Sequence, residues 1–402
     1  SEFEQGLGKR KAIYKLFPQA VPSKPVIDKE NCKMLKDGKC GVCAKICPTG
    51  AINFEDQDQL ITENYGAIIV STGYELIQWQ KYYGEYGYGR YPDIITGLHF
   101  ERLSNASGPT EGKILRPSDG QEPKDIVFIK CVGSRDVNKG KSYCSRACCM
   151  YTAKHAHQAM EKIDGARAYI FYMDIRTPGK GYDEFYMRTA DEGAIYLRGR
   201  VSKIYQENGK LICLGEDTLS DRNIKIAADL VVLETAMVPN EAAANVASLL
   251  GLATDKDGWM QEAHPKLRPV ETHTGGVFLA GTCQGPKDIP DTVAQASAAA
   301  AKVCALFSKD QMPTNPMISS VDNEKCSGCG ICVPVCPYKA IELQDIPCVV
   351  NGKRGFRQVA AINKGLCQGC GGCTVNCRTG AIDLLGFTNK QILEEVDALC
   401  LK

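Results

Sequence analysis

Two cysteine runs near the C-terminal end of the 402-residue chain place the strongest constraint on its fold. Both have the spacing C-x2-C-x2-C-x3-C, with Cys326, Cys329, Cys332 and Cys336 in the first run and Cys367, Cys370, Cys373 and Cys377 in the second. The residues after them repeat too, as Cys336-Pro-Tyr-Lys-Ala-Ile341 and Cys377-Arg-Thr-Gly-Ala-Ile382. Glycines between the cysteines let each short loop wrap closely around a bound group. This part of the chain is therefore a duplicated module built around thiolates.

The spacing is that of bacterial ferredoxins, in which the first three thiolates of a run bind one [4Fe–4S] cluster and the fourth binds the other. We therefore expect one cluster on Cys326, Cys329, Cys332 and Cys377, and a second on Cys367, Cys370, Cys373 and Cys336. Zinc sites use two separated C-x2-C pairs, and disulfides do not require this spacing, so both alternatives fit less well. The expected function is electron transfer.

Composition excludes several other classes. The chain is 44% hydrophobic, which supports a sizeable core and about two to four domains. A formal net charge of +1, without a basic run interleaved with aromatic residues, gives no indication of nucleic-acid binding. Apolar stretches are too short to span a bilayer, and the start does not have the layout of a signal peptide. Sixteen of the twenty-one cysteines lie in ligand-like groups, which favours a reducing, anaerobic cytoplasm over a secreted disulfide scaffold.

Three zones separate along the chain. Residues 1–60 carry a third cysteine group, residues 61–310 read as α/β, and a Pro-marked linker at 312–316 leads into the duplicated module. In the middle zone, β-rich runs at 66–71, 125–130 and 168–173 alternate with helical patterns at 148–163 and 292–307.

The N-terminal group consists of Cys32, Cys40, Cys43 and Cys47, followed by Pro48, and is a ferredoxin run with an insertion after its first cysteine. It could hold one cluster with all four thiolates. Alternatively, it is half of a two-cluster module, and Cys47 then binds a cluster completed by residues outside this sequence. A start without Met favours the second interpretation, in which the upstream half is missing.

The middle zone resembles the pyridine-nucleotide disulfide oxidoreductases, and thioredoxin reductases in particular. Residues 67–73 resemble the strand and Thr-Gly turn that leave their FAD domain, residues 226–233 the returning crossover, and residues 274–281 their second FAD motif. The resemblance implies flavin contacts from Thr72, Gly73, Gly281, Thr282, Lys287, Asp291 and Gln295. The helix that starts near Asp291 would direct its N-terminal N–H groups at the flavin N1/O2 edge, with Gln295 in its first turn. Lys287 is either a donor to flavin N5 or a solvated lysine.

Two departures from that family concern the flavin. Thr282-Cys283 stands where the family has an Asp that contacts the ribityl chain, and no G-x-G-x-x-G motif occurs anywhere in the sequence. FAD binding is therefore expected only together with a missing N-terminal part.

A fourth cysteine group, Cys131, Cys144, Cys148 and Cys149, lies where a nicotinamide-binding unit is expected. The functional interpretation is a cluster in the dinucleotide cleft, and the alternatives are a zinc site or buried structural thiols. His155 and His157 are expected to be ordinary helix residues, and Cys283 to be packed in the core. The remaining cysteines match no ligand set: Cys213, Cys304, Cys348 and Cys400.

Residues 6–14, 131–136, 143–155 and 284–299 resemble the family of A-type subunits of heterodisulfide reductase, and this resemblance extends over essentially the whole chain. It implies a flavoprotein with a two-cluster ferredoxin insert, a cluster on its reductase-like domain and a C-terminal two-cluster domain. It also implies a bifurcating flavin, which splits an electron pair between a high-potential disulfide and low-potential ferredoxin. By this resemblance, residue 1 falls inside the ferredoxin insert.

The expected fold is α/β and thioredoxin-reductase-like, with an incomplete FAD domain, a degenerate NAD-like domain and ferredoxin-like α+β modules at both ends. The expected parts are a half-ferredoxin (1–60), an FAD-domain crossover strand (61–73), an NAD-like domain with a [4Fe–4S] site (74–236), a second FAD-domain part (237–310) and a two-cluster domain (311–402).

The implied function is electron transfer between FAD, three to four [4Fe–4S] clusters, ferredoxin and disulfide-reducing subunits of a bifurcating complex. The complex would be an oxidoreductase acting on sulfur groups; this chain alone would be catalytically incomplete, and no catalytic residue is assigned. Implied partners are B- and C-type subunits, a hydrogenase- or dehydrogenase-linked donor subunit, ferredoxin and the missing N-terminal polypeptide. The alternative is a flavin-free, polyferredoxin-like subunit.

Overall fold

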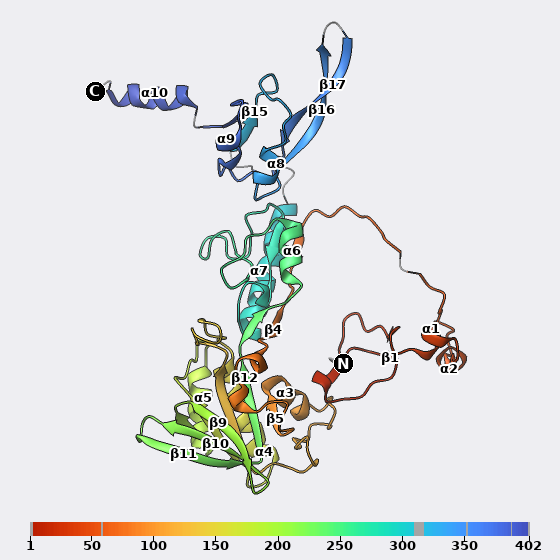
Figure 1. Cartoon of the computed structure of the whole chain (residues 1–402), viewed down its shortest axis with the longest axis vertical. Coiled ribbons are helices and arrows are strands. Elements are labelled where there is room, and N and C mark those ends of the chain that lie inside the picture. Colours follow the sequence, from red (N-terminus) through yellow and green to blue (C-terminus); the bar gives the residue numbers. More distant parts are fainter. Residues whose placement is uncertain (1–2, 58, 309–316, 351–352, 387, 401–402) are drawn as a thin grey trace. The chain divides into compact units, whose positions relative to one another are not determined.

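The computed structural model describes residues 3–57, 59–308, 317–350, 353–386 and 388–400 (Figure 1). The chain forms two compact units, one of Ser1–Asn64 and Leu76–Met237, and the other of Tyr65–Glu75 and Val238–Lys402. The expected linker at 312–316 lies outside the described residues. The five-part domain division stays a prediction.

A parallel five-stranded sheet forms the centre of the first unit. Its strand order is β5 (Ile94–Thr96), β12 (Leu230–Thr235), β6 (Asp125–Val132), β7 (Arg167–Tyr172) and β8 (Ile195–Arg198), and all neighbours pair in parallel. The helices between the strands are α3 (Gly97–Ser104), α4 (Cys148–Lys162) and α5 (Tyr182–Asp191). All eight residues of β6 are buried, as expected for a central strand covered on both faces. The predicted α/β class is confirmed.

One face of this sheet packs against α3 and α4. Ile126 and Phe128 of β6 lie in one buried cluster with Phe100 of α3 and Ala156 of α4. The rings of Phe100 and Phe128 meet edge to face, with centroids 5.5 Å apart. Small alanines on α4 let the helix approach the strands closely. This packing fixes the end of α4 that carries cysteines against the end of β6 that carries Cys131.

The opposite face is covered by a three-stranded antiparallel sheet of β9 (Val201–Glu207), β10 (Lys210–Asp217) and β11 (Arg222–Ala228). Gly215 of β10 lies so close to the ring of Phe171 on β7 that a Cβ atom there would be 2.6 Å from it. The second sheet therefore packs directly on the first.

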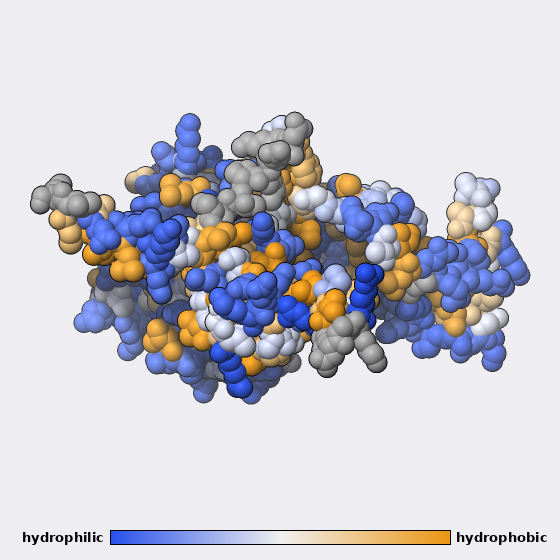
Figure 2. Space-filling view, turned by 90° about the horizontal axis from the view of Figure 1, so that it is seen from above, coloured by the Kyte–Doolittle hydropathy of each residue, from blue (hydrophilic) through white to orange (hydrophobic). Residues whose placement is uncertain are grey.

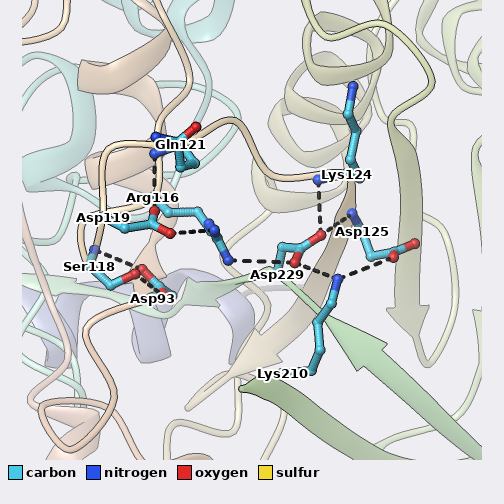
Figure 3. A network of polar contacts seen from close by, with 9 residues as sticks. All are labelled: Asp93, Arg116, Ser118, Asp119, Gln121, Lys124, Asp125, Lys210 and Asp229. Atoms are coloured by element: carbon cyan, nitrogen blue, oxygen red, sulfur yellow. Dashed lines mark hydrogen bonds and ion pairs between the residues drawn. The ribbon is translucent and has the colours of Figure 1, made fainter. Parts of the chain in front are cut away.

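A polar network ties the beginnings of β6 and β12 to this second sheet (Figure 3). Asp229 accepts hydrogen bonds from the backbone N–H groups of Lys124 and Asp125, each at 3.0 Å, through one carboxylate oxygen. Its other oxygen accepts from Lys210 Nζ at 2.5 Å and lies 3.6 Å from Arg116. Burial acts to raise the pKa of Asp229, but the hydrogen bond from Lys210 and the two backbone donors lower it overall.

The N-terminal part of the first unit contains short elements only. They are η1 (Phe3–Gly6), β1 (Ile13–Tyr14), β2 (Val26–Ile27), α1 (Lys33–Asp37) and α2 (Val42–Ile46). Two further short helices, η2 (Trp79–Lys81) and η3 (Gly84–Tyr86), follow where the chain returns to this unit after residue 75. The start of the chain is held to α3, because Arg102 donates to Glu4 at 2.6 Å and His99 Nε2 lies 3.0 Å from the carbonyl oxygen of Gln5.

The second unit begins with a small two-stranded sheet of β3 (Ile68–Val70) and β14 (Val277–Leu279). Another small sheet pairs β4 (Tyr74–Leu76) with β13 (Met237–Pro239) at the two points where the chain passes from one unit to the other. The helices in this part of the second unit are α6 (Ala243–Leu250), η4 (Gly281–Cys283) and α7 (Ile289–Phe307). Strand β14 runs parallel to β3 and is buried on both faces, with Leu279 in the cluster that includes α6 residues and Phe278 in the cluster that includes Ala299 of α7. The turn after β14 is thereby held beside the end of β3.

The rest of the second unit is a duplicated α+β module. Its elements are β15 (Ser319–Val321), α8 (Cys332–Val335), β16 (Ile341–Val350), β17 (Lys353–Ile362), α9 (Gly372–Asn376), β18 (Ile382–Leu384) and α10 (Asn389–Cys400). β15 pairs with β18, and β16 pairs with β17, both antiparallel. Strands from the two halves therefore alternate around a shared core that includes Cys332 and Cys373.

Figure 2 shows apolar residues open at the surface among hydrophilic ones. Within the described residues, each helix is too short or too polar to cross a lipid bilayer.

Candidate functional site

Cysteines from both halves of the C-terminal module surround one hollow. A space of about 320 Å³, which is partly open to solvent, is lined by Cys326, Cys329 and Cys332 of the first run and by Cys377 of the second. Apolar side chains such as Leu343 and Ile382 and polar ones such as Thr379 line the rest of it. This is the set of three thiolates plus one that the ferredoxin spacing predicts for one cluster.

The cysteines of the second predicted set, Cys367, Cys370, Cys373 and Cys336, also have neighbours in common. Ser319 contacts two of its members, because its backbone N–H donates to Cys367 Sγ at 3.4 Å and its hydroxyl lies 3.1 Å from Cys373 Sγ. The other two flank Tyr338: burial raises the pKa of this phenol, and the nearby Cys370 and Cys336 raise it further.

Backbone N–H groups reach the sulfurs of both runs in a reciprocal pattern. Ala360, seven residues before Cys367, donates to Cys326 Sγ at 3.4 Å, whereas Ser319, seven residues before Cys326, donates to Cys367. Ala340 and Ala381, each four residues after a fourth cysteine, donate to that cysteine at 3.3 and 3.2 Å. Hydrogen bonds to cluster sulfurs are one of the means by which proteins set cluster potential. The module therefore has an internal two-fold arrangement around its thiolates.

Glycines make the two halves fit together. A Cβ atom on Gly328 would lie 2.5 Å from the carbonyl oxygen of Gln358, and one on Gly369 would lie 2.1 Å from that of Met317. Both glycines also have positive φ, at 67° and 66°. Only glycine satisfies both requirements at these positions.

The N-terminal cysteines have the local geometry of the C-terminal runs. Cys43 lies inside the short helix α2, and Cys47 ends it with an extended backbone (φ −71°, ψ 114°). Cys336 after α8 and Cys377 after α9 have nearly the same angles, with φ of −77° and −80°. Cys32 is buried and directly precedes α1. The hydroxyl of Thr49 and backbone N–H groups, including that of Ala51, lower the pKa of Cys47.

The hairpin of β1 and β2 repeats a pairing from the C-terminal module. In that module, the residue five positions before each first cysteine pairs with the residue five positions after the fourth cysteine of the other half: Val321 with Ile382, and Ile362 with Ile341. Ile27, five positions before Cys32, pairs with Ile13 in the same way. The position five residues before Ile13 is Gly8, which carries no thiol. β1 therefore lies where the C-terminal module has a strand of its other half, and no pattern in the sequence predicted this pairing.

The central cysteines gather at a strand end and a helix start. Cys131 is near the end of β6 and is buried, and Cys148 and Cys149 are the first residues of α4. Interaction with the neighbouring thiol of Cys148 lowers the pKa of Cys131 and of Cys149, and the same interactions raise the pKa of Cys148. Cys144 precedes them in the loop, where its sulfur accepts from the backbone N–H of Arg146 at 3.3 Å.

Strained backbone surrounds this group. Cys131, Arg135 and Arg146 all have left-handed conformations, with φ of 60°, 56° and 55°, which non-glycine residues rarely adopt outside functional or over-determined sites. The loop is held in place because the hydroxyls of Ser134 and Ser145 lie 2.7 Å apart, and Ser145 also accepts from the buried N–H of Met237.

Among the residues that the structure describes, no group of three or more Cys, His, Asp or Glu side chains converges as ligands of one metal ion would. A [4Fe–4S] cluster does not require such convergence, because each thiolate binds a different iron at a corner of the cube. The lack of convergence on one point is therefore compatible with [4Fe–4S] clusters at these cysteines.

The helix residues His155 and His157 both lie beside carboxylates. His155 is buried between two carboxylates, with Nε2 2.8 Å from Glu101 and Nδ1 3.7 Å from Glu234. His157 contacts Glu192 at 2.6 Å.

The predicted flavin residues surround the turn after β14, beside the end of β3. Thr72 follows β3, and its buried hydroxyl has no hydrogen-bond partner among the described residues. Gly281 donates its backbone N–H to Gln295 at 2.8 Å, and Lys287 donates to the carbonyl oxygen of Gly281 at 3.1 Å. Thr282 lies within η4. The buried thiol of Cys283 donates a hydrogen bond to the carbonyl oxygen of Val70 at 3.2 Å.

Two details of helix α7 differ from the sequence-based expectation. The helix begins at Ile289, so that Gln295 lies in its second turn and not in its first. Asp288 is its N-cap and accepts from the backbone N–H of Asp291 at 2.9 Å. Gln295 and Lys287 thus hold the Gly281 turn, while Gly73 (φ 74°) lies in the turn after β3.

Comparison with known proteins gives matches along most of the chain. Residues 320–342 match the family of 4Fe–4S binding domains. The A subunit of the H2:CoB-CoM heterodisulfide, ferredoxin reductase of Methanothermobacter marburgensis is 44% identical over 351 residues, which cover 87% of this chain and 52% of the relative. The iron-sulfur A subunit of the CoB–CoM heterodisulfide reductase of Methanocaldococcus jannaschii is 44% identical over 402 residues, covering 99% of this chain and 59% of the relative.

A third relative is the A subunit of the ferredoxin:CoB-CoM heterodisulfide reductase of Methanosarcina mazei, 42% identical over 394 residues, 98% of this chain and 47% of the relative. The chain thus spans about half the length of the curated relatives it matches. Among solved structures, the thioredoxin reductase of T. acidophilum matches with a TM-score of 0.37 and 15% identity, over 60% of this chain and 66% of that one.

Proposed function

The chain is a homologue, over most of its length, of the A-type subunits of heterodisulfide reductase, and from this premise we propose that it transfers electrons within a heterodisulfide reductase-type complex. The C-terminal module, which contains the matched 4Fe–4S binding domain, holds two [4Fe–4S] clusters. The observation that carries this proposal is the hollow lined by three cysteines of one run and the fourth cysteine of the other.

Two further clusters complete the proposed set. Cys131, Cys144, Cys148 and Cys149 hold one in the first unit, supported by the strained loop and by the contacts among their thiols. Cys32, Cys40 and Cys43 bind another in the N-terminal module. There Cys47 is positioned like Cys336 and Cys377, which bind across to the other half, and the pairing of β1 supports a partner half around it.

A flavin site is proposed at the Gly281 turn, formed jointly with another polypeptide segment. A cofactor fits beside the ends of β3 and β14. The Thr72 hydroxyl there has no hydrogen-bond partner within the described part of the chain, Gly73 forms a turn, and Gln295 and Lys287 hold the Gly281 turn. The first FAD motif is absent from the sequence. Apolar residues of this region also lie open to solvent, such as Ile69 on β3 and Val293 on α7, the latter 58% exposed. A covering segment that carries the first motif accounts for both observations.

We propose that FAD, when bound there, accepts two electrons as a pair and passes them on singly to two different acceptors. Low-potential electrons pass to ferredoxin through one cluster module, and another module receives electrons from a hydrogenase- or dehydrogenase-linked subunit. B- and C-type subunits carry out disulfide reduction. This chain provides cysteines and flavin-positioning residues for that route, and it is not catalytically complete alone.

Metal and flavin analysis test these proposals. The chain, reconstituted anaerobically with iron and sulfide, is expected to bind iron and acid-labile sulfide in equal amounts and to give low-temperature EPR signals of reduced [4Fe–4S] clusters. Zinc in place of iron would contradict the cluster assignment.

The alternative, a flavin-free electron-transfer subunit, is supported by the missing first FAD motif. Flavin uptake separates the two. The chain mixed with FAD alone is expected to retain little flavin, and the chain together with a polypeptide that carries the first motif is expected to retain it. An assembled complex without flavin would eliminate bifurcation.

A further inference from the structure

Lys130 is a buried cation next to the central cysteines. It follows Ile126 and Phe128 on the same face of β6, the face that packs against α3 and α4. Only 7% of the residue is exposed. Its ammonium donates to Cys149 Sγ at 2.9 Å. The register of β6 against α4 therefore brings a positive charge to a proposed cluster ligand that is nineteen residues away in sequence.

Burying an ammonium group is costly unless an anion compensates its charge. The surroundings of Lys130 Nζ are the sulfur of Cys149 and the ring of Tyr172, whose centroid is 5.9 Å away. Cys149 also accepts from the backbone N–H of Arg176 at 3.3 Å. Both donors point at a sulfur that would bind iron as a thiolate, so they lie where they can compensate its negative charge. The lysine and the thiolate thus compensate each other.

The sulfurs of the C-terminal module have a different kind of hydrogen-bond donor. The contacts to sulfur that the structure describes there come from uncharged donors, namely backbone N–H groups such as that of Ala360 and hydroxyls such as that of Ser319. Hydrogen bonds from a charged donor are roughly twice as strong as those from a neutral one. A [4Fe–4S] cluster with four thiolates is anionic and gains a further negative charge on reduction, so that net charge and hydrogen bonds to its sulfurs set its potential.

We propose that Lys130 is the residue that raises the reduction potential of the Cys131–Cys149 cluster above the potentials of the two C-terminal clusters. This cluster then accepts electrons before the C-terminal pair does and holds them more firmly. The proposal deepens the proposed function, because it rests on a cluster at Cys131, Cys144, Cys148 and Cys149. Lys130 acts as a positioning and charge-compensating residue and not as a ligand.

Redox titration followed by EPR on the full reconstituted chain tests the proposal. The signal that disappears in Cys131→Ser identifies the central cluster. Lys130→Met keeps most of the side-chain volume and removes the charge. We expect it to weaken reduction of this cluster at least tenfold, a lowering of about 59 mV for one electron. Lys130→Arg retains a cation and is expected to stay close to wild type. Lys203→Met, at an exposed position of strand β9, is the matched control and should leave all potentials unchanged.

The signals of the C-terminal clusters report in each variant whether the second unit is intact. An unchanged or higher potential of the central cluster in Lys130→Met, or in Lys130→Gln as a second neutral variant, would overturn the role of Lys130. If Cys131→Ser removes no iron and no signal from the wild-type chain, then the proposed cluster site itself is wrong. The two failures are therefore distinguishable.

Discussion

The C-terminal module holds two sets of four cysteines and the central group holds one set, and the two regions position their cysteines by different means. In the module, short loops of two duplicated halves supply the thiolates, and each half donates backbone N–H groups to the sulfurs of the other. In the central group, the strand β6, a strained loop and the helix α4 supply them, and a buried lysine contacts one sulfur. The module is therefore encoded by local spacing, whereas the central group depends on the packing of an α/β sheet.

The largest expected effect concerns ligand exchange between the halves of the module. Cys377→Ala is expected to abolish or alter the same EPR signal as Cys326→Ala, because both cysteines line one hollow. Iron content should fall as well. Cys348→Ala, in the same module but outside the ligand sets, serves as the control. If Cys377→Ala instead affects the signal that Cys367→Ala removes, then each run binds its own cluster and the crossed arrangement is wrong.

A glycine substitution distinguishes close packing of the halves from simple ligand supply. Gly369→Ala forces a left-handed conformation on alanine, which costs about 1–2 kcal/mol, and brings its Cβ to 2.1 Å from the carbonyl oxygen of Met317. We expect a lower thermal midpoint and partial loss of iron from the module, with the central cluster unaffected. Gly355→Ala, where nothing lies near the added Cβ, is the control. The same thermal midpoint and iron content in both variants would show that the close contact at Gly369 does not contribute to stability.

The central group should depend on distant parts of its sheet. Asp229→Ala leaves two backbone N–H groups at the start of β6 without their acceptor, which is expected to cost about 1–3 kcal/mol. Thermal unfolding followed by circular dichroism should show an earlier first transition, while the EPR signals of the C-terminal clusters persist. Asp119→Ala removes a more exposed carboxylate from the same network and should have a smaller effect. Simultaneous loss of all clusters would contradict the independence of the two regions.

The smallest effect is a pH dependence near α4. The hydrogen bond from His155 lowers the pKa of Glu101 to about 2. Burial acts to lower the pKa of His155, but Glu101 and Glu234 raise it overall. The Glu101 contribution to stability is present above pH 4.5 and is lost as the pH falls towards 2. The His155 contribution is present below pH 6.5 and is lost as the pH rises through the raised pKa.

Hydrogen exchange of α4 peptides, corrected for the intrinsic rate, measures both arms of this dependence. His155→Gln should remove the loss of protection at high pH, by an amount on the order of 1 kcal/mol. A variant at the exposed end of the helix, Glu161→Gln, should keep the wild-type profile. The same high-pH loss in His155→Gln would assign the dependence to another group.

Much of the candidate site could be predicted from the sequence where the signal is local. The spacing of Cys326 to Cys377 predicted the crossed set that lines the hollow, and the β-rich runs and helical patterns predicted the α/β class. The position of Gln295 was wrong by one turn, because Pro290 and the N-cap Asp288 start α7 earlier than Asp291. The pairing of β1 with β2 was missed, since two-residue strands have no periodicity that a sequence can display.

Local spacing was enough to predict the crossed cysteine set that lines the C-terminal hollow, because a ligand run closes its loop within a few residues and its spacing sets its geometry. Hydrophobic periodicity was enough to predict the alternation of strands and helices in the middle of the chain. Packing between distant segments, in contrast, brings Lys130 to Cys149, lets Asp229 connect three strands, and pairs β1 with β2 at the positions where the halves of the C-terminal module pair. These features depend on register and face between segments far apart in the chain. A one-residue change of register would reverse the face of β6 and turn Lys130 away from the thiolates.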